Sequence, residues 1–231
     1  CAFEILSFAP ERIDRLALLD TTARADDPDR MAWRRNFLAS ADDGDFQAIK
    51  RQSLEAYIHP SRYDDPNLMA EFDAVVLTQD WHPAGHSSFA STHDGKAPFD
   101  MVEMPYGPQV LWPDHCVQGS RGAQFHDGLN TDRADLIVRK GYNPRIDSYS
   151  AFFENDHKTP TGLEGYLRTR GIEKLTMVGL ATDFCVNFSA VDAAKLGFDV
   201  TLREDLCRAI DMDGSLKAAM EGMRGAGVVV A

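Results

Sequence analysis

The sequence predicts a three-layer α/β/α sandwich with a mostly parallel central sheet. From about residue 67 onward, short and nearly all-apolar runs alternate with amphipathic stretches, which is the order expected of strands and helices in such a sheet. A glycine follows each amphipathic stretch, the usual signal that a helix ends. The length of 231 residues fits a single domain over residues 1–231, with residues 1–66 as an atypical N-terminal region.

Each candidate strand is short and almost entirely apolar, as in strands that are buried on both faces of a parallel sheet. The candidate strands are Leu16–Leu19, Ala74–Thr78, Leu136–Arg139, Leu175–Leu180, Val200–Arg203 and Val228–Val230. The candidate helices between them are Gly162–Arg170, Cys185–Leu196 and Ser215–Arg224. Residues 28–40 and 47–58 also have a helical pattern, and the Pro- and Gly-rich residues 92–114 are expected to form an ordered loop over a site.

Composition argues against several functional classes. Asp and Glu outnumber Lys and Arg by 36 to 24, a net charge of −12, so binding to nucleic acid or to an anionic membrane is not expected. No apolar run approaches the ~18 residues of a membrane-spanning helix, and no signal peptide is visible. The four cysteines, Cys1, Cys116, Cys185 and Cys207, show no paired spacing, which is typical of a reduced cytoplasmic chain.

Asp80-Trp81-His82 forms the first candidate site, directly after the strand Ala74–Thr78. In extended backbone, residues i and i+2 point to the same side, so Asp80 and His82 can bind one ion, with His115 as a third ligand. One carboxylate and two imidazoles suit Zn²⁺, Fe²⁺ or Mn²⁺ with coordination positions left open. The alternative is that Asp-x-His arises by chance and that these histidines are ordinary loop residues.

Cys185 forms the second candidate site. An apolar strand ends at Leu180, residues 181–183 turn the chain and a helix begins, so Cys185 falls in the first turn of that helix. Unpaired N–H groups and the helix dipole stabilise a thiolate there, and the same amides can bind an oxyanion. The alternative is a buried structural cysteine that acts as a small hydrophobe, which is the interpretation given to the other three cysteines.

Lys140 follows the apolar run Leu136–Val138, so it stands at the tip of a predicted central strand. From there its ammonium group would project over the same face as Cys185 and could hold a thiolate and a carboxylate in register. The ordinary alternative for a lysine is a solvated surface charge. Three aromatic residues are candidate walls for a flat substrate, with loop packing as the alternative: Trp112, Tyr149 and Phe152.

Four segments, taken in order, resemble the nicotinamidases, which are metal-dependent members of the isochorismatase-like cysteine hydrolases. The segments are TQDWHPAGHSSFA, YGPQVLWPDHCVQG, RKGYNPRIDSYSAFF and VGLATDFCV. The resemblance runs from about residue 67 to residue 231 and implies an isochorismatase-like fold. Four ordered motifs of this length are far more specific than any one of them alone.

The resemblance implies a metal site made by Asp80, His82 and His115, with His86 close by but outside the coordination sphere. It implies one divalent transition metal as the cofactor, with Zn²⁺ favoured over Fe²⁺ and Mn²⁺. In the family this ion binds the pyridine nitrogen of the substrate and polarises the ring, and does not supply an attacking hydroxide.

The resemblance also assigns catalytic residues. Cys185 matches the nucleophile and Lys140 the lysine of the catalytic triad. The bond between Leu180 and Ala181 matches a cis peptide bond, and the amides of Ala181 and Cys185 match an oxyanion hole. Two further residues match positions that flank the pyridine ring: Trp112 and Tyr149.

The N-terminal region departs from the family pattern. Family members open with an apolar strand that ends in an aspartate, the third member of the triad. Leu16–Leu19 followed by Asp20 has this local form, but Asp20 lies further from Asp80 than the family spacing. Asp42 is nearer to the expected spacing, although the preceding NFLASA is a weak strand. Asp20 is therefore preferred to Asp42, and a chain without the triad aspartate is the third alternative.

The first strand of this architecture lies in the middle of the sheet. An empty slot would leave two rows of backbone N–H and C=O groups unpaired, each costing on the order of 1–3 kcal/mol. A segment of residues 1–66 must therefore fill the slot. Leu16–Leu19 and residues 3–8 are available, and Leu16–Leu19 is preferred.

These roles together predict an amidohydrolase that converts nicotinamide and water to nicotinate and ammonia through a thioester on Cys185, a reaction of NAD salvage. Two alternatives stay open. A catalytically impaired relative without the triad aspartate would bind nicotinamide without releasing ammonia. Another amidase of the superfamily would act on a carbamoyl or N-acyl substrate, but such relatives generally lack the three metal ligands. The expected partner is a small molecule, and homo-oligomerisation is left open.

Overall fold

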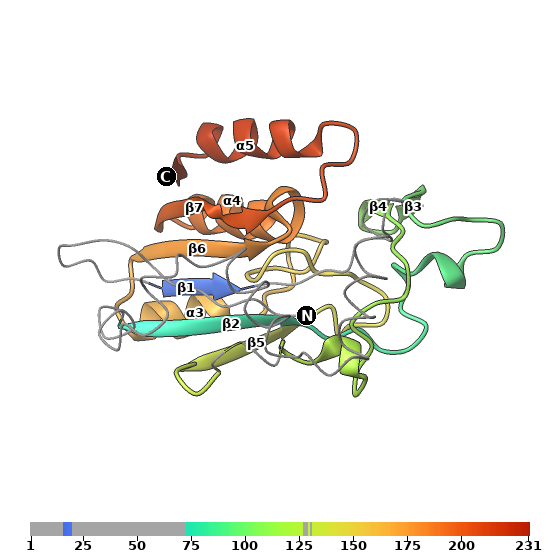
Figure 1. The fold of residues 1–231 in the computed structure, drawn as a ribbon, viewed down its shortest axis with the longest axis horizontal. Helices are drawn as coiled ribbons and strands as arrows, with labels where there is room; N and C mark the ends of the chain where they lie inside the picture. Colours follow the sequence, from blue (N-terminus) through green and yellow to red (C-terminus); the bar gives the residue numbers. More distant parts are fainter. Residues whose placement is uncertain (1–15, 20–72, 127–128, 130) are drawn as a thin grey trace, which may run out of the picture.

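Six parallel strands form the central sheet of the computed structural model, which describes residues 16–19, 73–126, 129 and 131–231. Their order across the sheet is β5-β2-β1-β6-β7-β8, and every neighbouring pair is parallel (Figure 1). The strands are β1 Leu16–Leu19, β2 Ala74–Asp80, β5 Leu136–Lys140, β6 Lys174–Leu180, β7 Asp199–Arg208 and β8 Val229–Val230. All six strands predicted from apolar runs are therefore confirmed.

The strand β1 fills the central slot of the sheet. Its backbone pairs with β2 from Leu16 opposite Ala74 onward, and with β6 from Leu16 opposite Leu175 onward. Figure 1 shows β1 between these two neighbours. The prediction that residues 16–19 occupy this position is confirmed, whereas the alternative segment, residues 3–8, lies outside the described residues.

Three α-helices connect the strands in the C-terminal half of the chain. They are α3 Leu163–Thr169, α4 Asn187–Lys195 and α5 Ser215–Gly225. The crossovers from β5 to β6, from β6 to β7 and from β7 to β8 all step in the same direction across the sheet. Because parallel crossovers are right-handed, these helices cover one face. The α/β fold is confirmed, and the candidate helices 28–40 and 47–58 lie outside the described residues.

The segment 92–114 contains more structure than the ordered loop that was predicted. It includes an antiparallel hairpin made of β3 Met101–Met104 and β4 Gly107–Val110. The pattern did not indicate these strands because β3 is largely exposed and β4 contains Pro108, a residue that argues against a strand. Two short 3₁₀ turns, η3 Ala90–Thr92 and η4 Arg121–Ala123, lie on either side of the hairpin.

The helical segment after β6 begins three residues earlier than predicted. A π-helical turn, η5 Thr182–Val186, leads directly into α4. The Ala181 carbonyl accepts hydrogen bonds from the backbone N–H groups of Phe184 and Val186, both at 3.1 Å. Cys185 thus lies in the first turn of a helical segment, as expected, but that turn is π-helical.

The hydrophobic core packs the sheet against its helices. Its fully buried members come from several elements and include Leu77 of β2, Leu167 of α3 and Leu202 of β7. Phe152 belongs to this core, with its ring 5.9 Å from that of Phe198, so its prediction as a pocket wall is wrong. Within the described ranges, no helix is both long enough and apolar enough to cross a membrane.

Candidate active site

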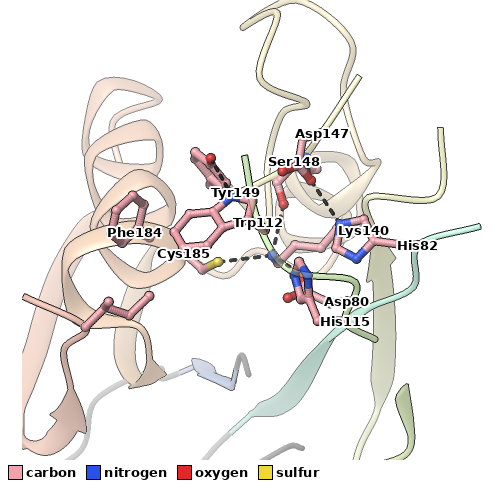
Figure 2. A pocket seen from close by; sticks show the side chains of 11 residues that line it. Asp80, His82, Trp112, His115, Lys140, Asp147, Ser148, Tyr149, Phe184 and Cys185 are labelled. Atoms are coloured by element: carbon pink, nitrogen blue, oxygen red, sulfur yellow. Dashed lines mark hydrogen bonds and ion pairs between the residues drawn. The ribbon is translucent and has the colours of Figure 1, made fainter. Parts of the chain in front are cut away.

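A pocket lies where the carboxyl ends of β2, β5 and β6 meet (Figure 2). Ligands of open parallel sheets bind at this edge. Seven of the lining residues were predicted from the sequence: Asp80, His82, Trp112, His115, Lys140, Tyr149 and Cys185. Four others were not: Asp147, Ser148, Phe184 and Ile210. The fold therefore gathers these seven predicted side chains around one cavity.

The ammonium group of Lys140 lies at the centre of the site. Its Nζ is 2.6 Å from Asp80 Oδ1 and 3.4 Å from Cys185 Sγ, and it donates to the Ser148 carbonyl at 2.9 Å. Figure 2 shows Cys185 on one side of this nitrogen and Asp80 with His115 on the other. The Lys140 side chain is fully buried, and a buried charge requires such partners. This excludes the surface-charge interpretation of Lys140.

Cys185 presents its sulfur to the pocket from the turn η5. The neighbouring ammonium group favours the thiolate form of a cysteine. Ser189 Oγ donates to the Cys185 carbonyl at 2.6 Å and accepts from Ala151 N at 2.9 Å, which fixes the backbone at Cys185. The peptide bond between Leu180 and Ala181 is cis, as the resemblance implied.

The other cysteines have different surroundings. Cys116 and Cys207 are buried and do not line the pocket, in agreement with their structural interpretation. Burial raises the pKa of the Cys207 thiol to about 12, so this sulfur is a poor nucleophile. Cys1 lies outside the described residues.

His82 and His115 lie close together in the pocket lining, with ring centroids 4.6 Å apart. His115 Nδ1 donates to the Pro113 carbonyl at 2.8 Å, which leaves Nε2 as the nitrogen with a lone pair. Burial lowers the pKa of His115, so this imidazole is neutral, as a metal ligand must be. His82 Nδ1 is buried and has no hydrogen-bond partner in the described part of the chain.

A divalent transition metal fits the atoms available here. They are Nδ1 of His82, which has no hydrogen-bond partner among the described residues, the lone pair of His115 Nε2, and the Asp80 carboxylate beside them. This donor set of two nitrogens and one oxygen suits Zn²⁺, Fe²⁺ or Mn²⁺. The predicted set of Asp80, His82 and His115 remains a prediction. Among the described residues, a different set has potential ligand atoms that all lie within 4.8 Å of one another: His82, His86 and Asp147.

His86 is a poor ligand in this second set because both of its nitrogens are used. Ser88 N donates to His86 Nδ1 at 3.1 Å, and His86 Nε2 donates to the Asn143 carbonyl at 2.7 Å. Burial lowers the pKa of His86, which is consistent with this neutral tautomer. The arrangement agrees with the place outside the coordination sphere that the resemblance implied.

Asp147 is a buried carboxylate of the pocket lining that was not predicted from the sequence. Its Oδ1 lies 3.0 Å from His82 Nε2 and accepts from Ser148 N at 2.8 Å, and its Oδ2 accepts from Gln109 Nε2 at 3.3 Å. Burial alone would raise the pKa of Asp147, but the hydrogen bond and the charge of His82 hold it well below its usual range. The one signal in the sequence was its place two residues before Tyr149 in a segment already singled out.

Aromatic rings line the pocket beside Cys185. The Trp112 ring centroid lies 4.9 Å from that of Phe184 and 6.1 Å from that of Tyr149. Trp112 Nε1 donates to the Tyr149 hydroxyl at 2.9 Å, which fixes both side chains. Burial raises the pKa of Tyr149 well above its usual value, so the hydroxyl stays protonated. These residues leave a mainly apolar wall suited to a flat ring.

A buried carboxylate, Asp183, positions a further residue of the pocket lining. Asp183 of η5 accepts hydrogen bonds from Ile210 N at 3.0 Å and from Asp211 N at 2.8 Å. Because Asp183 lies two residues before Cys185, the same turn that carries the sulfur also positions Ile210, which lines the pocket. Neither role is visible from the sequence alone.

Comparisons with known proteins agree with this geometry. Residues 73–231 match the family model described as the isochorismatase domain. A nicotinamidase of Acinetobacter baylyi is 56% identical over 157 residues, which cover 68% of this chain and 73% of that protein. The solved Acinetobacter baumanii nicotinamidase pyrazinamidease is 55% identical, with a TM-score of 0.69 over 71% of this chain and 79% of that one. PnC1 from L. infantum, solved in complex with nicotinate, is 43% identical, with a TM-score of 0.60 over 71% of this chain and 75% of that one.

Proposed function

The chain belongs to the isochorismatase domain family, and from that premise we propose that it is a nicotinamidase, which converts nicotinamide and water to nicotinate and ammonia. The observation that carries the proposal is the buried Lys140 ammonium group, which contacts both the Cys185 sulfur and the Asp80 carboxylate. A thiol and a cation at this distance are the parts that a cysteine amidohydrolase needs. The similarity to nicotinamidases supports the choice of substrate.

The aromatic wall would hold the pyridine ring of nicotinamide. Trp112 and Phe184 supply apolar surface, and the Tyr149 hydroxyl is kept in place by Trp112 Nε1 and Gln109 Nε2. A divalent ion held by Asp80, His82 and His115 would, when bound, anchor the ring nitrogen and withdraw electron density from the ring. Because Lys140 engages Oδ1 of Asp80, the second carboxylate oxygen is the one that would bind the ion.

Cys185 would attack the carboxamide carbon as a thiolate that the Lys140 ammonium group stabilises. A C–S bond forms, and the carbonyl oxygen becomes an oxyanion that the amides of Ala181 and Cys185 bind. Collapse of this intermediate breaks the C–N bond, and a carboxylic acid near Lys140 gives its proton to the departing ammonia. Water then hydrolyses the thioester, which releases nicotinate and restores the thiol.

We assign the proton transfer to Asp20. This residue follows β1, which is the central strand and lies between β2, which ends at Asp80, and β6, which leads to the turn of Cys185. The carboxyl ends of parallel strands share one edge of a sheet. Asp20 and the weaker candidate Asp42 both lie outside the described residues. A general acid of this kind contributes about 10²–10⁴-fold to the rate.

Ammonia release tests the proposal directly. The Zn²⁺-loaded enzyme should release ammonia from nicotinamide, and release from benzamide, which lacks the ring nitrogen, should be much slower. Removing the metal with a chelator should slow the reaction on nicotinamide, and added Zn²⁺ should restore it. Binding of nicotinamide without ammonia release would contradict the proposal and favour an impaired relative. Release only from a carbamoyl or N-acyl substrate would contradict it in favour of another amidase.

A further inference from the structure

We propose that Asp147 is a positioning residue for the metal site: it holds the Nε2–H of His82, so that Nδ1 is the atom His82 presents to the ion. This inference rests on the metal site of the proposed function. It adds a residue that the resemblance did not assign, and it specifies which nitrogen of His82 ligates.

The tautomer of His82 follows from its two nitrogens. Nε2 lies 3.0 Å from Asp147 Oδ1, and both side chains are buried. An ionised carboxylate can only accept hydrogen bonds, so Nε2 of His82 carries a proton, and a metal ion can bind this ring only at Nδ1, in the form that has no proton there. Nδ1 then carries the lone pair, and this atom is the buried one without a partner among the described residues. A ligand that binds Nδ1 would supply the missing interaction.

The carboxylate of Asp147 is itself held rigidly. Ser148 N donates to Oδ1 at 2.8 Å and Gln109 Nε2 donates to Oδ2 at 3.3 Å. Gln109 is fixed in turn, since its Oε1 accepts from Asn155 Nδ2 at 3.0 Å and its Nε2 donates to the Tyr149 hydroxyl at 2.7 Å. One buried network therefore connects the aromatic wall to His82. A carboxylate that fixes the second nitrogen of a metal-bound histidine is a recurrent arrangement.

The rival assignment makes Asp147 a direct ligand together with His82 and His86. The hydrogen bonds argue against it, because both nitrogens of His86 and both oxygens of Asp147 already have partners. In that assignment the ion would also have to displace the contact between His82 Nε2 and Asp147 Oδ1. The His82, His86 and Asp147 cluster is thus explained as a hydrogen-bonded support of the site.

Zn²⁺ affinity, measured by competition with a chromogenic chelator, tests the role of Asp147 in the full chain. Asp147→Ala should weaken Zn²⁺ binding about 10–100-fold. Asp147→Asn keeps an oxygen that accepts from Nε2–H, so it should recover part of this loss. The control is Asp192→Asn, which changes a buried carboxylate of α4 that does not line the pocket, and its affinity should match that of the wild type. Equal affinities in wild type and Asp147→Ala would overturn the proposal.

Nitrogen NMR of histidine-labelled wild-type protein provides a test that needs no Asp147 variant. Adding Zn²⁺ should shift the Nδ1 resonance of His82 while its Nε2 keeps its proton, and should shift Nε2 of His115. A Zn²⁺ shift at His82 Nε2 would overturn the proposal. Neither readout involves ammonia release, so a failure here is distinguishable from a failure of the hydrolase proposal.

Discussion

Asp80 and Lys140 are register partners at the ends of two neighbouring parallel strands. Each is the last residue of its strand, β2 and β5 respectively, and their Cα atoms pair in the sheet. Their side chains meet with Lys140 Nζ 2.6 Å from Asp80 Oδ1, although 60 positions separate them in the sequence. This pairing places the ammonium group against the sulfur of Cys185, so the sheet register itself builds this contact.

Breaking this ion pair should harm both stability and activity. In Lys140→Met the Asp80 carboxylate stays buried without its cation, which costs about 3–5 kcal/mol, and the thiolate loses its stabilising charge. Urea denaturation and ammonia release measure the two effects. The control is Lys195→Met, which removes an exposed lysine at the end of α4. An unchanged free energy of unfolding in Lys140→Met would show that the pair does not form.

Gly141 should be required for the position of His82. It directly follows Lys140 and has a φ of +67°, and a Cβ built on it would lie 2.5 Å from His82 Nε2. The matched control is Gly171, whose φ is +70° and whose Cβ would meet nothing within 4 Å. Both alanine variants should lose about 1–2 kcal/mol because the left-handed backbone disfavours a side chain.

The two glycine variants should differ in function. Gly141→Ala should weaken Zn²⁺ binding and slow ammonia release, because the new methyl group displaces the His82 ring. Gly171→Ala should leave both properties as in the wild type, measured at a temperature where each variant is folded. If the two variants bound Zn²⁺ equally well, the close approach of Gly141 to His82 would be irrelevant to the site.

The sequence predicted the strands and the helical turn that carries Cys185 because their signals are local. A strand buried on both faces is a run of apolar residues, and the strand, turn and helix around Cys185 follow one another within a few positions. The central position of β1 was also predictable, since the sheet needs a strand there and residues 16–19 are apolar.

The buried contacts of Asp147 could not be predicted because its partners are distant in the chain. Gln109 and His82 lie 38 and 65 positions away, so no local pattern marks the carboxylate as buried. The hairpin of β3 and β4 was missed for a related reason. Its residues are partly exposed, so no apolar run marks the strands, and they are recognised only by their hydrogen-bonded pairing with each other. Similarly, the placement of Phe152 in the core depends on Phe198, from a different segment.

The pH dependence of stability should report on Asp147. Its pKa is lowered from the usual 3.8 in the folded protein, so the unfolded chain takes up the proton first as the pH falls. The stabilisation is therefore complete above about pH 4 and is lost as the pH drops toward the folded pKa, at up to about 1.4 kcal/mol per pH unit. The free energy of unfolding of the wild type should thus begin to approach that of Asp147→Asn as the pH falls below about 4. A gap that is independent of pH would contradict the lowered pKa.

The most direct test of the whole account is the rate of ammonia release from nicotinamide by Cys185→Ala. The matched control is Cys207→Ala, which removes a buried thiol that does not line the pocket, and Zn²⁺ binding shows that each variant is folded. The account predicts that Cys185→Ala binds Zn²⁺ but releases ammonia only at the uncatalysed rate, whereas Cys207→Ala retains the activity. Release by Cys185→Ala at the wild-type rate would contradict the central claim that this sulfur is the nucleophile.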